Sequence, residues 1–393
     1  MRDLVIVSAV RTIGGSFGGS LKKLTAPELG AKVIAESVKR AGISAKDVDQ
    51  VIFGNGWQAG VGANPARIAS VKAGIPVDTT AFTVNMRCGS SLRALQLGLL
   101  SVGAGETEII VAGGTESSSN VPYILPDARW GHRMGRKVVD DVLHKDGFIC
   151  PLADMFMGDT AEILAQKYNI SREEQDEYAL HSQNKALKAI ENNAFTEEIV
   201  PIEIKDRKKG IIVVDKDETV RQTSLEKLAK LKTVFKKENG TVTAGNSCAL
   251  SDAASSVVVM SAAKAKELGL KPLAKVLSYS FVGLEPVHMG LGPALAMPKA
   301  LQKAGMSIDD MDLIELNEAF AAQVIACDRE FKMNRDKLNV YGGAIALGHP
   351  VAATGTKILT TLLYGLKHQD KQFGIASLCI GGGQGVALVV ERM

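Results

Sequence analysis

The stretch AGISAKDVDQVI, residues 41–52, occurs again in a related form 263 residues later as AGMSIDDMDLIE, residues 304–315. Each copy follows a segment with the apolar spacing of a helix, expected over residues 27–40 and 293–303. Each copy also has a glycine where that helix would end, and then a short polar turn and an apolar strand. The repeat predicts that the chain consists of two homologous halves.

The first half alternates short apolar strands with helices. Helices between strands predict parallel sheets that are covered on both faces. Two such halves predict an α/β fold, a layered αβαβα sandwich. A stretch of different character, roughly residues 118–249, interrupts the pattern and contains a helix expected over 172–192. We therefore expect an N-terminal half, 1–269, that includes this insertion, and a C-terminal half, 270–393. The other elements expected in the first half are strands at 4–9, 51–53, 83–85 and 109–112 and helices at 64–73 and 89–103.

Composition restricts the class of protein. The chain has 393 residues, of which 46% are apolar and 23% charged, as in soluble globular proteins. A net charge of +3 provides no field for binding nucleic acid. No apolar run approaches the roughly 18 residues that span a bilayer, and the N-terminus has the pattern of a strand rather than of a signal peptide. We expect a cytoplasmic protein with no nucleic-acid or membrane partner.

The cysteines exclude two kinds of site. Their number is five, and no pair has the CxxC spacing. An odd number without this spacing indicates neither a disulfide framework nor a zinc site, and we expect no metal. A single cysteine is most often a small buried apolar residue, so a chemical role needs further support from its surroundings.

Four segments provide that support, because each places a reactive side chain in a turn of small residues after an apolar run. Cys88 precedes a predicted helix, whose N-terminus lowers a thiol pKa and offers N–H donors, so we expect it to be a nucleophile. His349 lies near the equivalent turn of the second half and could take the thiol proton, although a lone histidine there would more often be structural. The segments are NMRCGSS (85–91), LNEAF (316–320), GGAIALGHP (342–350) and CIGGGQG (379–385).

In this order the four segments resemble the thiolase family, over essentially the whole chain. The resemblance implies CoA-dependent cleavage of a 3-oxoacyl-CoA, or the reverse Claisen condensation, by ping-pong chemistry through an acyl-cysteine. It implies that Cys379 removes the α-proton of the second substrate. One oxyanion hole would consist of His349 and a water held by Asn317, and the other of the backbone N–H groups of Cys88 and Gly381. Asn317 could instead be a helix N-cap.

The resemblance also implies a binding site for coenzyme A and acyl-CoA, which are substrates and not permanently bound cofactors. The insertion would be the loop domain that carries coenzyme A. Its segment 205–238 is basic, which indicates either a solvated surface or a site for a phosphorylated ligand. The positions that match substrate contacts in the family are Phe156, Met157, Arg221, Ala244, Ser247, Cys248, Met289 and Phe320.

Several residues depart from the short-chain thiolase pattern. Ala352 and Thr354 replace glycine and serine of H-P-x-G-x-S-G, and Ser117 and Ser118 replace the last two residues of G-G-x-E-N-M. Three other departures carry the prediction about the substrate. Ser91 replaces the last glycine of C-G-S-G, Phe156 replaces a histidine, and Cys248 replaces a serine expected near the pantetheine. Because the phenylalanine adds apolar bulk, we predict an acyl chain larger than acetyl. The alternative is neutral drift within an acetoacetyl-CoA thiolase.

Two other functions remain open. A ketoacyl synthase-like condensing enzyme shares the fold but lacks the second cysteine, so Cys379 argues against it. A subunit of a larger acyl-CoA-binding complex is the other alternative, although such a protein would tend to lose Cys88 or His349. The family resemblance implies a homodimer or homotetramer, with a possible accessory subunit.

Overall fold

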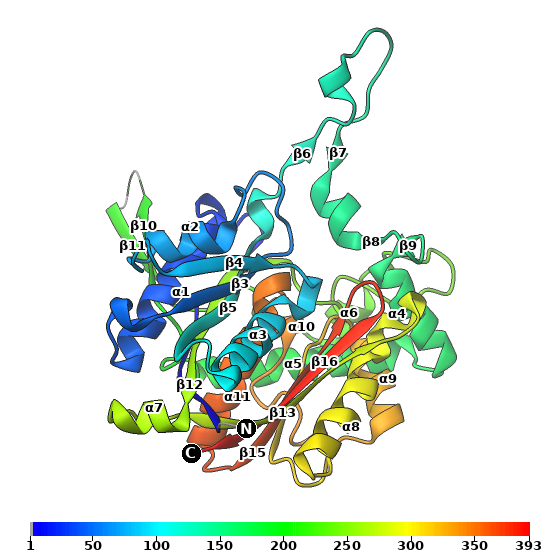
Figure 1. The fold of residues 1–393 in the computed structure, drawn as a ribbon. Coiled ribbons are helices and arrows are strands. Elements are labelled where there is room, and N and C mark those ends of the chain that lie inside the picture. The colour runs from blue at the N-terminus through cyan, green and yellow to red at the C-terminus, as the bar shows by residue number, and fades with distance from the viewer. Residues whose placement is uncertain (1–2, 207, 209) are drawn as a thin grey trace.

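A large mixed sheet organises the molecule (Figure 1). The structure, a computed structural model, describes residues 3–206, 208 and 210–393, and within this part ten strands form the sheet in the order β14-β15-β16-β13-β1-β12-β5-β3-β4, with β2 beside β12. The strands are β1 (Leu4–Arg11), β2 (Gly15–Ser16), β3 (Gln50–Gly54), β4 (Thr80–Val84), β5 (Ile109–Ser117), β12 (Ser251–Ser261), β13 (Ala274–Gly283), β14 (Leu313–Leu316), β15 (Phe373–Ile380) and β16 (Gln384–Arg392).

The sheet consists of two matching parts. In the first, β3 is parallel to β5, β5 is antiparallel to β12, and β12 is antiparallel to β1. In the second, β14, β15, β16 and β13 repeat these relations in the same order. The parts meet through only two residue pairs between β1 and β13. The prediction of two homologous halves is confirmed.

The repeated stretches have the same local structure. Gly42 and Gly305 each follow a helix in the left-handed conformation, with φ of 73° and 70°. This conformation favours glycine because a Cβ would crowd the following carbonyl. The carboxylates of Asp47 and Asp310 each accept the backbone N–H three residues earlier, at 2.8 and 2.7 Å. The same sequence pattern therefore ends a helix and starts a strand twice.

Helices cover both faces of each part and produce five layers. Helices α1 and α2 pack on the outer face of the first part, α3 and α11 lie between the two parts, and α8 and α9 pack on the outer face of the second. Strands between two helical layers are buried on both sides: Val5 joins the outer cluster and Ile6 the central one. The αβαβα arrangement is confirmed. The helices are α1 (Ala26–Ala41), α2 (Pro65–Lys72), α3 (Ser90–Ala104), α8 (Gly292–Ala304), α9 (Ala321–Phe331) and α11 (Thr354–His368).

The expectation of parallel sheets is wrong for most strand pairs. Among the strands that the structure describes, only β3 with β4, β3 with β5, and β14 with β15 run parallel. Three residues, 381–383, connect β15 to β16, which is too short for a parallel crossover. Strand β12 follows the long insertion and not a crossover helix. The predicted alternation of strands and helices therefore fails before β12 and between β15 and β16.

The insertion separates into parts that lie at different places. The ladder of β6 (Tyr123–Ile124) and β7 (Asp140–Asp141) leads into an arm that projects from the body (Figure 1). A π-helix, η6 (Leu143–Phe148), and the pair β8 (Ile149–Cys150) and β9 (Met155–Phe156) lead back toward the body. The remaining elements are α4 (Met157–Lys167), α5 (Arg172–Glu191), β10 (Ile202–Asp206), β11 (Gly210–Val214), α6 (Leu225–Ala229) and α7 (Ala262–Glu267).

The basic segment 205–238 does not form a single patch. Its first part belongs to the β10–β11 hairpin beside α1 and α2, whereas α6 lies on the opposite side of the molecule, near α4 and α5 (Figure 1). Arg207 and Lys209 of this segment lie outside the described residues. Only the part from Arg221 onward is placed to meet a ligand near α4. In the part of the chain that the structure describes, no helix is long and apolar enough to cross a membrane.

Candidate active site

Cys88 lies where the first half presents a turn to the second. It belongs to the 3-10 turn η3 (Arg87–Gly89), which connects β4 to α3, and it is half-buried. Its Sγ is 3.2 Å from Nε2 of His349. The structure therefore brings together two residues that are 261 positions apart and that the sequence suggested as nucleophile and base.

His349 lies between the short helix α10 (Ala344–Leu347) and the 3-10 turn η8 (Val351–Ala353), just before α11, and is only 6% exposed. Its Nδ1 is 2.7 Å from Oγ1 of Thr354, which is 3.0 Å from the carbonyl oxygen of Pro350. The carbonyl can only accept, so the single hydroxyl proton of Thr354 is donated to it. The hydroxyl then accepts from Nδ1–H, and this assignment leaves the Nε2 lone pair facing Cys88.

Burial keeps both members of this pair neutral at rest. Burial, and then Lys357 and Arg87, lower the pKa of His349 to about 3. Burial also raises the pKa of the Cys88 thiol, although Arg87 and the backbone N–H of Gly381 act in the opposite direction. The expectation of a lowered thiol pKa is therefore wrong: α3 begins two residues after Cys88, and the turn is desolvated. The Cys88 thiol therefore has to transfer its proton directly to His349.

Cys379 lies near the end of β15 and is 1% exposed. Burial, with the neighbouring thiols of Cys88 and Cys248, raises its pKa well above the usual range. Two residues further, the Cα of Gly381 lies against the side chain of Met157, because a Cβ at that glycine would be 2.9 Å from the methionine Cε. Cys379 is thus buried near Cys88, with Gly381 lying beside both cysteines.

Asn317 follows β14 and is 1% exposed. Among the described residues, neither its amide oxygen nor its amide nitrogen has a hydrogen-bond partner. Buried amides almost always have partners, so this side chain is suited to hold a water or a substrate group. The N-cap of the following helix is Phe320, which excludes the alternative role of Asn317 as that helix's cap.

Three of the predicted substrate-site residues pack around Cys379, and a fourth lies at the margin. Met157, Met289 and Phe320 share one apolar cluster with this cysteine. Phe156 lies at the margin, with its ring centroid 6.1 Å from that of Phe235. These large side chains limit the space available to an acyl group.

Sequence reasoning missed Phe235, which lies in the basic segment that was expected to be a surface or a phosphate site. Its ring is 6.3 Å from Phe320 and lies directly on Gly158, where a Cβ would come within 2.0 Å of the ring. Gly158 is therefore required by close packing. In a single sequence nothing links these two positions.

The other residues expected to contact coenzyme A range from half-buried Cys248 and Ser247 to exposed Ala244 and Arg221. Cys248 donates its backbone N–H to Ala319, at 3.0 Å, and burial together with Cys88 raises the pKa of the Cys248 thiol to about 12. The Ser247 hydroxyl donates to the Thr243 carbonyl at 2.7 Å. Further out, exposed Arg221 directs Nη2 to the carbonyl of Ala244 at 3.3 Å.

Ser91 does not line the acyl site, although it was among the departures used to predict a larger substrate. It is completely buried, and its hydroxyl accepts the backbone N–H of Thr356 at 3.0 Å. A Cβ at Gly355 would come within 2.9 Å of the same hydroxyl. Ser91 therefore fixes α3 against α11 and gives no support to a larger acyl chain.

Glu116, at the end of β5, is a second residue that sequence reasoning missed as part of the site. Its carboxylate accepts from Nδ2 of Asn55 and from the backbone N–H groups of Gly56, Trp57 and Ala352, at 2.9 to 3.1 Å. Burial raises its pKa to about 7, although these four donors favour the ionised form. Glu116 thus ties the turn that carries the histidine to the first half. A carboxylate four residues after the apolar run 109–112 was the available signal.

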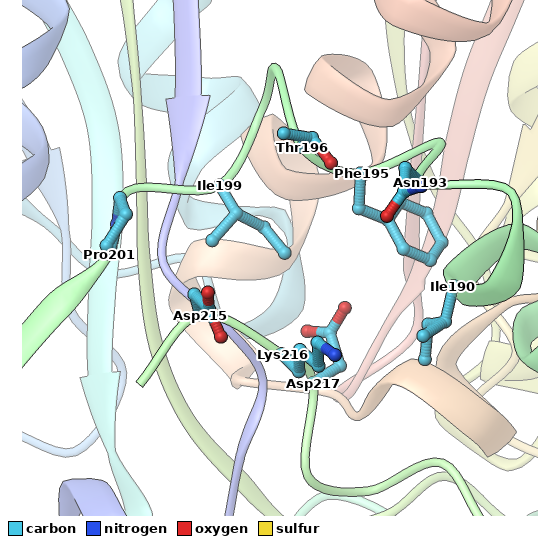
Figure 2. A pocket seen from close by; sticks show the side chains of 9 residues that line it. All are labelled: Ile190, Asn193, Phe195, Thr196, Ile199, Pro201, Asp215, Lys216 and Asp217. Atoms are coloured by element: carbon cyan, nitrogen blue, oxygen red, sulfur yellow. The ribbon is translucent and has the colours of Figure 1, made fainter. Parts of the chain in front are cut away.

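A hollow lies among residues of the insertion (Figure 2). It has a volume of about 290 Å³ and is lined by Phe195 and Asp217, among others. Nη1 of Arg11 lies 2.8 Å from Oδ1 of Asp217, and both side chains are fully buried. Because both oxygens of Asp217 bind the guanidinium, this wall belongs to a structural ion pair. In the described residues, no group of three or more histidine, cysteine or acidic side chains could hold a metal ion.

Comparison with known families agrees with the fold and the site. The model of the thiolase N-terminal domain matches residues 4–263, and that of the thiolase C-terminal domain matches residues 270–392. The chain belongs to the thiolase family. It is accordingly a CoA-dependent acyltransferase.

Similar proteins carry related names. An acetyl-CoA acetyltransferase of Pseudomonas aeruginosa is 51% identical over the full length of both chains. A probable acetyl-CoA acyltransferase of Staphylococcus epidermidis is 47% identical over 100% of this chain and 99% of its own. The crystal structure of the Bacillus anthracis acetyl-CoA acetyltransferase superposes with a TM-score of 0.97 at 45% identity, covering 100% of this chain and 99% of that one.

Proposed function

We propose that Cys88 is the acyl-carrying nucleophile and that His349 accepts its proton. The observation that carries this proposal is the 3.2 Å distance from Sγ to Nε2, with Nδ1–H directed to Thr354. The sulfur attacks the thioester carbonyl while its proton moves to Nε2. When the C–S bond to the leaving thiolate breaks, Nε2 returns the proton, and the acyl group stays on Cys88.

The second half-reaction is assigned to Cys379. As a thiolate, it would take an α-proton from an acetyl thioester, and the resulting carbanion would form a C–C bond to the acyl carbon on Cys88. The C–S bond to Cys88 then breaks, and the sulfur leaves as a thiolate. Its pKa is raised by burial, so the cysteine has to be ionised by proton transfer within the site rather than by solvent. In the cleavage direction the same cysteine returns the proton to the carbon.

Two donor sets are suited to the two oxyanions. Nε2 of protonated His349 and a water on the Asn317 amide would serve one, which fits the amide's buried and unsatisfied state. The backbone N–H groups of Cys88 and Gly381 would serve the other. Removing one such donor typically costs about 3–4 kcal/mol of transition-state stabilisation.

For the substrate, we propose short 3-oxoacyl-CoA thioesters, with acetoacetyl-CoA preferred. The support is the packing of Met157, Met289 and Phe320 around Cys379, together with the names of the full-length relatives. The larger acyl group predicted from Phe156 and Cys248 is the competing proposal. Phe156 lies at the margin and not within the cluster around Cys379, which favours the short chain.

The test is kcat/KM for CoA-dependent cleavage of acetoacetyl-CoA beside longer and aromatic 3-oxoacyl-CoAs. We expect acetoacetyl-CoA to be preferred by about tenfold or more, because each misplaced methylene is worth roughly 1–3 kcal/mol in such a pocket. A tenfold preference for a longer or aromatic chain would establish the competing proposal. Cytoplasmic location, homodimeric or homotetrameric assembly and an accessory subunit stay predictions.

A further inference from the structure

Arg87, the residue before Cys88, has a backbone conformation that is unusual for its type. Its φ is 51°, in the left-handed region. Nine non-glycine residues of the described chain have positive φ, and seven of them are asparagine or aspartate, which tolerate this region. Such a conformation costs on the order of 1–3 kcal/mol and persists only where the surroundings fix it, often at functional sites.

The surroundings fix Arg87 at both its backbone and its side chain. Its N–H donates to Oδ1 of Asn85 at 3.1 Å, and its carbonyl accepts from the hydroxyl of Ser90 at 2.6 Å. Its guanidinium donates to the carbonyl oxygens of Asp146 and Gly147, the second at 2.6 Å. Both carbonyls belong to the π-helix η6, a type of element found frequently at functional sites.

The guanidinium of Arg87 places a positive charge in the site. None of the described carboxylates lies within ion-pair distance of it, and it donates to the two neutral carbonyls. Nε lies 3.7 Å from where a Cβ at Gly381 would be, beside Met157. An arginine is charged at every relevant pH.

The other titratable groups around Cys88 do not supply this charge. Burial keeps His349 neutral, and Cys248 and Cys379 have raised thiol pKa values. Glu116 disfavours the thiolate of Cys88, whereas Arg87 is the strongest charge that favours it. Lys357 acts on the histidine rather than on the thiol.

We propose that Arg87 is a positioning residue that stabilises the Cys88 thiolate with a permanent charge, held in place by the π-helix. This inference rests on the proposed role of Cys88 as nucleophile. Ionisation of Cys88 releases its proton to Nε2 of His349 and leaves a negative sulfur in a desolvated site. The charge of Arg87 favours this thiolate, although the same charge disfavours the imidazolium. Charge and rigidity together account for a strained arginine at this position.

The test is the rate of Cys88 alkylation by iodoacetamide between pH 6 and 10, located by peptide mapping in the full-length protein. The variants are Arg87→Gln, which keeps an amide NH₂ donor but no charge, and Arg87→Lys, which keeps the charge. Lys46→Gln is the control, because it removes an equal charge from an exposed position. Thermal unfolding checks that each variant is folded.

We expect Arg87→Gln to raise the apparent pKa of the Cys88–His349 pair by about one unit, which slows alkylation roughly tenfold below that pKa. Arg87→Lys should stay within about threefold of the unmodified protein, and Lys46→Gln should match it. A profile of Arg87→Gln that superimposes on that of the unmodified protein, or an equal shift in Arg87→Lys, overturns the proposal. If Cys88 of the unmodified protein does not react at all, the proposed function fails as well.

Discussion

The turns that precede α3 and α11 occupy equivalent positions in the two halves, yet they contribute different chemistry. Both helices have 15 residues, and their first residues, Ser90 and Thr354, are 264 positions apart. The first turn presents a half-buried thiol beside a fixed guanidinium. The second presents a buried imidazole whose Nδ1 is held by a hydroxyl. One supersecondary unit, used twice, thus presents a thiol in one copy and an imidazole in the other, and the neighbours of the two copies differ.

Those neighbours explain the difference. The insertion covers the first turn only in part, through η6, so the sulfur stays within reach of a substrate. The second turn is enclosed by the first half, where Glu116 binds Ala352. Because the second turn is shielded from water, the imidazole of His349 stays neutral, as a group that accepts a proton has to be.

The largest effect is expected where the first turn loses its thiol. Cys88→Ser should reduce CoA-dependent cleavage by at least about 1,000-fold, since a hydroxyl beside a neutral imidazole is a far weaker nucleophile. Mass spectrometry after incubation with acyl-CoA should show no acyl-enzyme. Full activity in this variant would remove the functional contrast between the two turns.

Cys379→Ser should separate the two half-reactions. We expect it to form the acyl-enzyme from a simple acyl-CoA and to lose α-proton exchange and condensation by about 100- to 10,000-fold, the usual range for a general base. Exchange of deuterium from acetyl-CoA, measured by NMR, tests this. If exchange stays as fast as in the unmodified protein, another residue is the base.

The link between the halves is tested by Glu116→Gln. The amide NH₂ would face N–H donors, so we expect a loss of about 2–3 kcal/mol in the free energy of unfolding and a slower acylation of Cys88. Urea unfolding and acyl-enzyme formation measure both effects. Glu191→Gln, at an exposed position, is the control. Equal behaviour of the two variants would mean that Glu116 does not position the second turn.

The dry environment of the second turn makes stability depend on pH. The unfolded chain binds a proton at His349 below pH 6.5, whereas the folded chain does so only near pH 3. The free energy of unfolding should therefore fall as the pH falls below 6.5, by about 1.4 kcal/mol per unit from this group. The slope between pH 6.5 and 4.5 should be smaller in His349→Asn, as urea unfolding will show. Identical slopes would mean that the histidine is protonated in the folded site.

Ser91→Gly should have the smallest effect. It removes one hydrogen bond between α3 and α11, which is worth about 1 kcal/mol in stability. The ratio of kcat/KM for short and long 3-oxoacyl-CoAs should stay within about twofold. A larger change in that ratio would return Ser91 to the acyl site, against its position in the structure.

The sequence by itself determined the internal repeat and the helices around it, because glycine C-caps and apolar spacing are local features. Short motifs, which are also local, singled out Cys88, His349, Asn317 and Cys379. It also placed α1, α3, α5 and α8 within one or two residues of their observed ends. The domain boundary at residue 269 stays a prediction.

Only the tertiary structure decided the direction of most strand pairs, since direction depends on where a connection leads and not on the strand itself. It also decided the proton affinities: desolvation comes from residues far apart in the chain, and it reversed the expected effect of the helix end on Cys88. Phe235, Glu116 and Arg87 became visible as neighbours of the site for the same reason. Their roles come from contacts with Gly158, Ala352 and Gly147, which no spacing along the chain reveals.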